Sequence, residues 1–418
     1  MWLPKLAFIL PTFSPLSSHS TQCRSTKSRR KLQTTSWISS RIVGLHSIHV
    51  SVFLGVLLKQ ADFTSFAISI STGRGKSLGV QGRLAKLRRL IQCPQTAKYI
   101  RRLSIWSFPS PDKSRNAAAF ILIPFDILEV MLTQLPSLQF LELKYVHITS
   151  NTDEFAYCPI PPPCSFHPSR TLQTLEMEGV ALDNLDTMLT SLLSLAQPSK
   201  LNLSAVFPAK HQDVVKYPPP VLTNPAITTS LRLTCVSDEC LQALISSAPN
   251  LKTLIIEGPH GPEKSLKLVG ELLQQLSSLE ELELSEYMFR GSVQWSDLPL
   301  EALQLKAVTI RLILDNNPLD FCKTWQAVAL FLHRIPRTVT RIKFIAELSD
   351  VPESLPRPLL PPSVLNPCFD RFPALHTVAF GWTLFHYPPR EQRTEQLMNL
   401  VRQLFPDLQR RGVLQYVP

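Results

Sequence analysis

One short phrase recurs along most of this chain and restricts its fold more than any other feature of the sequence. The phrase has the form apolar-x-x-apolar-x-apolar, as in "LQFLEL", where Leu138, Leu141 and Leu143 hold the apolar positions. Further copies occupy 100–105, 172–177, 251–256, 279–284, 300–305, 339–344 and 375–380, and half copies occupy 200–204 and 230–234. The middle residues of successive copies lie 21 to 39 residues apart, so the period is not fixed. A phrase that returns this often indicates a repeated structural unit.

Each copy of the phrase follows an amphipathic stretch and a helix-breaking residue. In "FDILEVMLTQLPSL" the apolar residues between Ile127 and Leu135 recur at helical spacing, Pro136 ends the helix, and Leu138 begins a strand. The same kind of stop stands two residues before the first apolar position at Pro249, Ser277, Pro373 and Pro406. Asp183 and the pair Ser237-Asp238 precede two other helical stretches and are predicted helix caps.

A unit of helix, stop, short strand and loop cannot bury its apolar stripe alone, whereas stacked units can. The predicted fold is therefore an α/β solenoid, with parallel strands on the concave face and helices on the convex face. The alternative is a conventional α/β domain with leucine-rich strands. We expect an irregular repeat array over residues 91–418, ending in a helix over about 390–412.

The N-terminal quarter of the chain has a different composition. Residues 1–110 hold 17 Lys and Arg residues and a single acid, Asp62, so the net charge of +11 for the whole chain comes from this part. The remainder is mildly acidic, which argues against nucleic acid as a partner. We expect residues 1–90 to form a basic, poorly ordered segment.

Two features of this segment bear on localisation. The apolar run 42–58 is at the short limit for a membrane span and contains two His and two Ser, which favours a buried segment over a membrane helix. An N-terminus rich in Arg and Ser and poor in acids is also typical of mitochondrial presequences. Cytoplasmic or nuclear localisation is the expectation, and a repeat scaffold targeted or tethered to a membrane or organelle by its N-terminus is the alternative.

The stretch "LTCVSDECLQALISSAPNLKTLIIEG" (233–258) carries a resemblance to a known family. Its Cys235, Asp238, helix through Ala248 and Pro249-Asn250-Leu251 are similar to the long repeat of F-box/leucine-rich-repeat proteins, and the irregular, Pro-rich array resembles their divergent fungal members. The resemblance implies a leucine-rich-repeat fold and a non-enzymatic protein-binding role. It further implies substrate recognition for a cullin-type ubiquitin ligase, bound through its adaptor by an F-box.

An F-box is not recognisable in the sequence. Residues 123–143 have its opening rhythm, but no second and third helix follow, and a strand phrase precedes them at 100–105. We interpret this stretch as a repeat helix that leads into its own strand, so no docking motif for a ubiquitin-ligase adaptor is seen.

Motifs of catalysis and cofactor binding are not convincing. "STGRGKS" (71–77) lacks the first Gly of a phosphate-binding loop, since that position is Ile70, and no strand is predicted to lead into it. Cys158, Cys164 and His167 do not have the spacing of a zinc site. The eight scattered cysteines indicate free thiols in a reducing compartment. We predict no enzyme activity, cofactor or metal.

The residues between the apolar positions should line the concave face. They are candidates for contacts with a protein partner: Phe140, Glu142, Lys144, Glu176, Glu178, Glu257, Glu281, Glu283, Arg341 and Lys343. Stacked strands would bring several of these carboxylates into one acidic row, which would attract a basic segment of the partner. The alternative is a solvated sheet face whose charges serve solubility.

Overall fold

The computed structural model describes the residue ranges 66–71, 97, 100–108, 121–150, 172–209, 228–245, 250–257, 263–290, 295, 298, 300–314, 318–348, 362–384 and 391–416. All of them fall in the second of the two units into which the chain divides, His46–Pro418. The apolar run 42–58, the loop 72–77 and the Cys158, Cys164 and His167 group lie outside the described residues.

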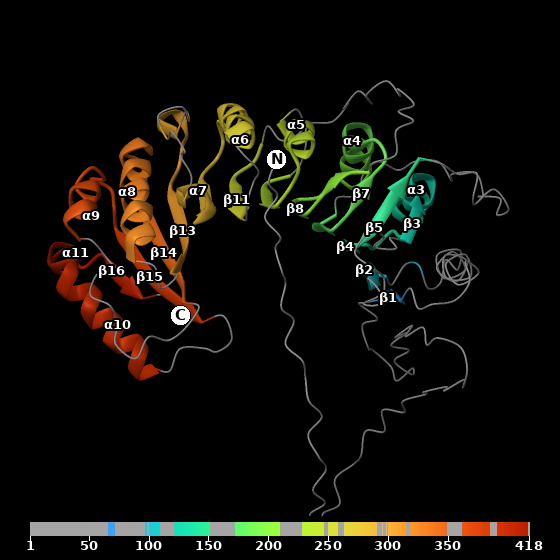
Figure 1. Cartoon of the computed structure of the whole chain (residues 1–418). Helices are drawn as coiled ribbons and strands as arrows, with labels where there is room; N and C mark the ends of the chain where they lie inside the picture. Colours follow the sequence, from blue (N-terminus) through green and yellow to red (C-terminus); the bar gives the residue numbers. More distant parts are fainter. Residues whose placement is uncertain are drawn as a thin grey trace, which may run out of the picture. The chain divides into compact units, whose positions relative to one another are not determined.

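A twelve-stranded sheet organises the described chain (Figure 1). Its strands are β1 (Phe66–Ser71), β2 (Arg102–Phe108), β4 (Phe140–Lys144), β6 (Thr174–Glu178), β8 (Lys200–Ser204), β10 (Ser230–Thr234), β11 (Thr253–Glu257), β12 (Glu281–Ser285), β13 (Ala307–Leu314), β14 (Arg341–Leu348), β15 (Thr377–Leu384) and β16 (Leu414–Tyr416). They lie side by side in the order of the sequence, and every neighbouring pair is parallel. The fold is therefore mixed α/β with one large parallel sheet.

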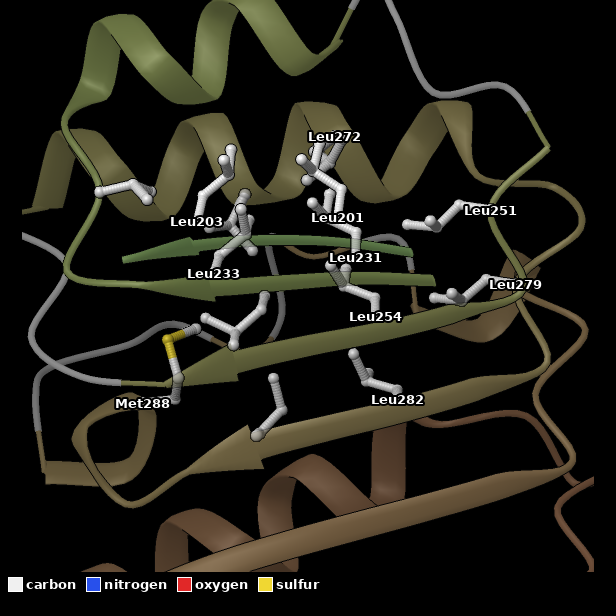
Figure 2. Close-up of a cluster of buried hydrophobic side chains, with 14 of the residues drawn as sticks. Leu201, Leu203, Leu231, Leu233, Leu251, Leu254, Leu272, Leu279, Leu282 and Met288 are labelled. Atoms are coloured by element: carbon white, nitrogen blue, oxygen red, sulfur yellow. The ribbon is translucent and has the colours of Figure 1, made fainter. Parts of the chain in front are cut away.

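The strands pair in a register that aligns their apolar positions. Leu201, Leu231 and Leu254 are direct neighbours on three successive strands, and Leu203 and Leu233 form the next row. Each of these side chains is at most 1% exposed. Figure 2 shows them stacked from strand to strand, with Leu272 of the covering helix above them. Alternate residues of a strand point to opposite faces. The last two apolar residues of each phrase therefore bury one face of the sheet, and the residues between them leave the other face polar.

The helices pack onto the leucine face. They are α3 (Phe125–Gln134), α4 (Leu185–Ala196), α5 (Asp238–Ile245), α6 (Glu263–Gln275), α7 (Tyr287–Arg290), α8 (Pro318–Arg334), α9 (Pro362–Phe369), α10 (Glu391–Leu404) and α11 (Pro406–Arg410), with a 3-10 turn at Leu300–Ala302. Each of these helices contributes buried side chains to the same hydrophobic cluster as the strand leucines. In Figure 1, α4, α5, α6 and α8 follow one another along this side of the sheet.

A left-handed residue ends four successive strands of the sheet and turns the chain towards a second, smaller sheet. Tyr145, Gly179, Ala205 and Cys235 have φ of 54°, 60°, 49° and 50°. Each donates its backbone N–H to the last carbonyl of the following strand, at 2.8 to 3.2 Å. The second sheet has the order β3 (Ile121–Pro124), β5 (Val146–Thr149), β7 (Ala181–Leu182) and β9 (Phe207–Pro208). Its strands β5, β7 and β9 begin one or two residues after Tyr145, Gly179 and Ala205. The hydrogen bonds offset the cost of the left-handed backbone, which is about 1–2 kcal/mol for a residue with a Cβ.

The structure corrects three boundaries predicted from the sequence. Residues 66–71, placed in the poorly ordered segment, form β1, so a strand does lead into the "TGRGKS" loop, although Ile70 still replaces the required Gly. The copy at 300–305 is out of register, because the sheet positions are Val308 and Ile310 on β13. The C-terminal helix is broken at Phe405, because Pro disfavours the helical conformation in the residue before it. Pro406 accordingly starts α11 and does not precede a strand.

Other local predictions had mixed outcomes. The F-box-like stretch forms α3 and leads directly into β4, which confirms its interpretation as a repeat helix. Ser237 accepts a hydrogen bond from the N–H of Cys240 and caps α5. Asp183 is not the cap of α4, because Asn184 takes that role with a bond from the N–H of Thr187. Cys235 is exposed, since the left-handed turn directs it away from the leucine core.

Candidate protein-binding face

The side of the large sheet opposite the leucine core is its polar face. All ten residues predicted for the partner surface stand at the strand positions that alternate with the apolar ones, so the structure places them on this face. The strand register brings Glu142 beside Glu176, Lys144 beside Glu178, and Lys343 beside Thr309. These neighbours are separate in the sequence and adjacent only through the sheet.

One lysine organises the part of the polar face formed by β2, β4 and β6. The ammonium of Lys144 lies 2.9 Å from Glu178, 3.1 Å from Glu142 and 3.5 Å from Glu176. Arg102 on β2 lies 3.8 Å from the Glu142 carboxylate. We call these five residues the first charge cluster. It holds three carboxylates and two cations, so one negative charge is in excess.

The pKa values in the first charge cluster follow from these contacts. The hydrogen bond from Lys144 to Glu178 has the largest effect on the pKa of the Lys144 ammonium and raises it, whereas burial acts to lower it. Burial acts to raise the pKa of Glu142, but hydrogen bonds from Ser104 and Lys144 and the charges of Lys144 and Arg102 outweigh it and hold that pKa below its ordinary value. Both groups are therefore charged at neutral pH.

Aromatic side chains border the first charge cluster. The guanidinium of Arg102 lies 4.1 Å from the centre of the Phe140 ring, a cation–π distance. The Tyr145 hydroxyl donates a hydrogen bond to Glu178 at 3.0 Å, and the residue is 39% exposed. Tyr and Arg at such positions are the residue types that dominate binding energy at protein interfaces.

A second group of ion pairs spans β10 to β14. Arg232 binds Glu257 through two hydrogen bonds of 2.9 and 2.7 Å. Arg311 pairs with Glu283 and lies 3.6 Å from both Glu257 and Glu347. A separate pair, Arg341 with Glu281 at 2.8 Å, lies on the same strands. We call these seven residues the second charge cluster.

The polar face is balanced in charge and is not an acidic row. Between β2 and β15 its described positions carry seven cations and seven carboxylates: Arg102, Lys144, Lys200, Arg232, Arg311, Arg341 and Lys343, and Glu142, Glu176, Glu178, Glu257, Glu281, Glu283 and Glu347. Arg232 and Arg311 were not among the predicted residues. Arg232 lies in a half copy of the phrase, and Arg311 lies beyond the copy predicted at 300–305, which was out of register. At β14 and β15 the polar face includes two apolar, buried side chains, because Ile345 and Ala379 are only 7% and 3% exposed.

A polar group outside this face joins the second sheet to α4. The carboxylate of Asp183 lies 2.6 Å from His147 Nε2 and accepts hydrogen bonds from the Thr149 hydroxyl at 2.6 Å and the Ser150 N–H at 2.9 Å. Burial acts to raise the pKa of Asp183, but these hydrogen bonds outweigh it and lower that pKa. Through these contacts the group ties adjacent repeats together.

The described ranges contain neither a metal-binding group nor a helix that could span a membrane. No group of three or more His, Cys, Asp or Glu side chains there could hold a metal ion. None of the helices in these ranges combines the length and apolar character needed to cross a bilayer. Cys235, Cys240 and Cys368 are free thiols.

Comparison with known proteins gives matches among solved structures alone. No protein-family model matches the chain. No curated protein matches its sequence. Among solved structures, the chain is similar to the leucine-rich repeat-containing protein LegL7 from Legionella pneumophila, with 14% sequence identity and a TM-score of 0.37 over 81% of this chain and 97% of that one.

Proposed function

We propose that this chain is a leucine-rich-repeat solenoid that binds a protein partner on the polar face of its sheet. The observation that carries the proposal is the division of the sheet into two faces. Every described helix packs on the leucine face. The polar face holds ordered rows of charged and aromatic side chains along successive strands. Stacked repeats generate extended surfaces of this kind, which are used for binding other macromolecules.

The repeat itself supports the proposal and shows how this chain departs from the usual pattern. The strand leucines have the spacing of the leucine-rich-repeat consensus, in which Asn or Cys stands three residues after the last strand leucine. Here that position is Val146, Val180, Val206 and Val236, all at most 5% exposed. The left-handed residue before each valine supplies the inter-repeat hydrogen bond. Apolar packing and backbone bonding therefore replace a polar side-chain ladder.

The balanced charge of the polar face defines the kind of partner. A purely basic segment would meet seven cations among the seven carboxylates, and most carboxylates are already paired within the chain. The partner surface would instead carry both signs of charge, matched to the two clusters. Its association rate would then depend only weakly on salt, because long-range attraction requires a net charge.

Substrate recognition for a cullin-type ubiquitin ligase is the finer form of this proposal. This role requires a module that docks on the adaptor. The F-box-like stretch does not supply it, because that stretch forms α3 of the repeat array. Co-precipitation from cells tests it: if the full-length chain brings down neither adaptor nor cullin, this form fails and the binding function remains. Tethering by the N-terminal segment is the alternative, and an entirely soluble full-length chain after cell fractionation would contradict it.

Site-specific photo-crosslinking tests the binding function. A crosslinking amino acid replaces Thr253, which lies on β11 in the polar face, or Gln326, which is exposed on α8 on the helix side. We expect a discrete crosslinked protein with the first variant and none with the second. Crosslinks from Gln326 alone, or equal crosslinks from both, would place binding elsewhere and refute the proposal.

A further inference from the structure

All strands of the large sheet begin at one edge, and from β2 to β11 the charges along this edge have a single sign. Each strand contributes its first residue and the residue before it, whose carbonyl accepts a hydrogen bond from the next strand. The charged residues at these described positions are Arg101, Arg102, Lys200 and Lys252, and none of the positions holds a carboxylate. We call these four residues the basic edge.

The cations of the basic edge are open to a partner. All four side chains are exposed. Arg102 lies 3.8 Å from the Glu142 carboxylate, and its side chain remains 51% exposed. The other three form no ion pair with any residue of the described ranges. Four positive charges therefore face solvent without close carboxylates to neutralise them.

The excess of positive charge is confined to this part of the sheet. On β12 to β14 the same positions hold two carboxylates and two cations, and they pair as Glu280 with Lys306 at 2.9 Å and Glu281 with Arg341 at 2.8 Å. At the opposite ends of β4 to β11 the last residues on the polar face are Lys144, Glu178, Ser204, Thr234 and Glu257. The polar face is thus balanced in total, but positive charge gathers where β2 to β11 begin.

Uncharged hydrogen-bonding groups stand between the cations. Gln139 and Gln173 precede β4 and β6, and both are exposed. Their side-chain amides form no hydrogen bond with any residue of the described ranges. A side-chain amide both donates and accepts hydrogen bonds, as the backbone of a peptide does. The edge therefore offers groups for the backbone of an extended peptide as well as for acidic side chains.

The spacing of the strands sets the length of such a peptide. Neighbouring strands lie about 4.8 Å apart, so the five intervals from β2 to β11 span about 24 Å. An extended chain rises about 3.3 Å per residue and covers this span with about seven residues. Double-stranded DNA carries one charge per about 1.7 Å of its axis, which is much denser than cations separated by two or three strands. The wide spacing favours an acidic protein segment over a nucleic acid.

We propose that the basic edge docks an extended acidic segment of the protein partner, about seven residues long. Arg102, Lys200 and Lys252 stand three and then two strand intervals apart, so the matching carboxylates should follow one another by about four and then three residues. This inference rests on the proposed binding function and adds a contact beside the balanced polar face. The acidic segment would give the association rate a dependence on salt that the polar face by itself does not supply.

Site-specific photo-crosslinking on the full-length chain tests the basic edge. A crosslinking amino acid replaces Gln173, which lies between Arg102 and Lys200, and the probes are fluorescent nona-glutamate and nona-lysine. A crosslink at Gln173 reports binding at this edge alone, so nona-glutamate bound to the cations of residues 1–90 does not contribute. We expect a crosslink with nona-glutamate and none with nona-lysine.

Charge variants in the same assay identify the responsible side chains. Lys200→Gln combined with Lys252→Gln should lower the yield of the nona-glutamate crosslink about fivefold. Lys267→Gln combined with Lys323→Gln removes the same charge from α6 and α8 on the helix side and should change the yield by less than about twofold. Lys200→Arg combined with Lys252→Arg keeps the charge and should retain the crosslink. Thermal unfolding by circular dichroism verifies that all three double variants are folded.

Each contrary outcome has a defined meaning. Absence of the nona-glutamate crosslink, equal crosslinking of the two peptides, or equal losses in the two double Gln variants would overturn the acidic-segment site. Stronger crosslinking of fluorescent polyuridine than of nona-glutamate would also overturn it, in favour of a nucleic acid. If a partner crosslinks at Thr253 while nona-glutamate does not crosslink at Gln173, the basic edge fails and the proposed function stands.

Discussion

Replacing Arg311 with Met tests whether the charges of the polar face stabilise the fold. Arg311 pairs with Glu283 and lies near Glu257 and Glu347, so one guanidinium holds carboxylates from three other strands. Methionine keeps much of the apolar stem and removes the charge. The three carboxylates would then face one another with fewer cations between them. Lys343→Met is the matched control, because Lys343 forms no ion pair with any residue of the described ranges.

The expected loss of stability follows from the exposure of the group. A hydrogen bond to a charged partner contributes about 1.5–3 kcal/mol when well buried. The Arg311 side chain is 29% exposed, so solvent screening reduces this contribution. We expect Arg311→Met to lower the free energy of unfolding by about 1.5 kcal/mol at pH 7. Lys343→Met should change it by less than about 0.5 kcal/mol.

Urea unfolding followed by circular dichroism measures this difference, with the slope of the transition used to check that both variants unfold alike. Equal losses in the two variants would refute the view that Arg311 acts by holding carboxylates together.

Three further predictions concern other parts of the fold. The pKa of Asp183 is lowered in the folded state, so its ionised form stabilises the fold above its unfolded pKa of about 4. This contribution is lost as the pH falls through the folded pKa. Asp183→Asn should therefore lower the free energy of unfolding by about 2 kcal/mol at pH 7, measured by urea titration, and by progressively less in acid. Gly179→Ala should destabilise the chain by about 1–2 kcal/mol, because the new Cβ would lie 2.7 Å from the Tyr145 ring in a left-handed backbone. In thermal unfolding, the double variant with Tyr145→Ala should regain the part of the stability that is lost through contact with the ring. No regain of stability would contradict the clash. Burial raises the pKa of the Cys240 thiol to about 12, so peptide mapping by mass spectrometry should find Cys240 unmodified by iodoacetamide until the chain unfolds, while the exposed Cys235 is modified in the native state.

Register was the feature of the repeat that the sequence left ambiguous. In "LEALQLKAVTI" the apolar residues at 300, 303 and 305 and those at 305, 308 and 310 have the same spacing, so the phrase fits the chain in two ways. Pairing with β12 selects the second, because it places Val308 and Ile310 beside Leu282 and Leu284. The 3-10 turn at Leu300–Ala302 then packs its buried leucine before the strand. A local pattern cannot decide between registers that only the neighbouring strand distinguishes.

For the candidate binding residues too, the local spacing predicted which face they occupy, whereas only strand pairing decided which residues they contact. The alternation of strand residues was sufficient to place all ten of them on one face, because side chains at positions two apart point the same way. The acidic row was not confirmed, because cations from the same strand and from neighbouring strands lie among the carboxylates. Arg311 stands opposite Ser285 and reaches Glu283 only through the pairing of β13 with β12, and no spacing within either segment reveals that contact.

The sequence by itself determined the repeating unit, the two sides of every predicted strand except β13, and the helices that cover them. Each of these depends on apolar spacing within a few residues and on local breakers such as Pro136. Only the tertiary structure decided how the charges are paired, which residues adopt the left-handed turns, and where the strand β1 joins the sheet. Those features depend on hydrogen bonds and ion pairs between repeats. Their partners are distant in the sequence and meet only when the strands stack.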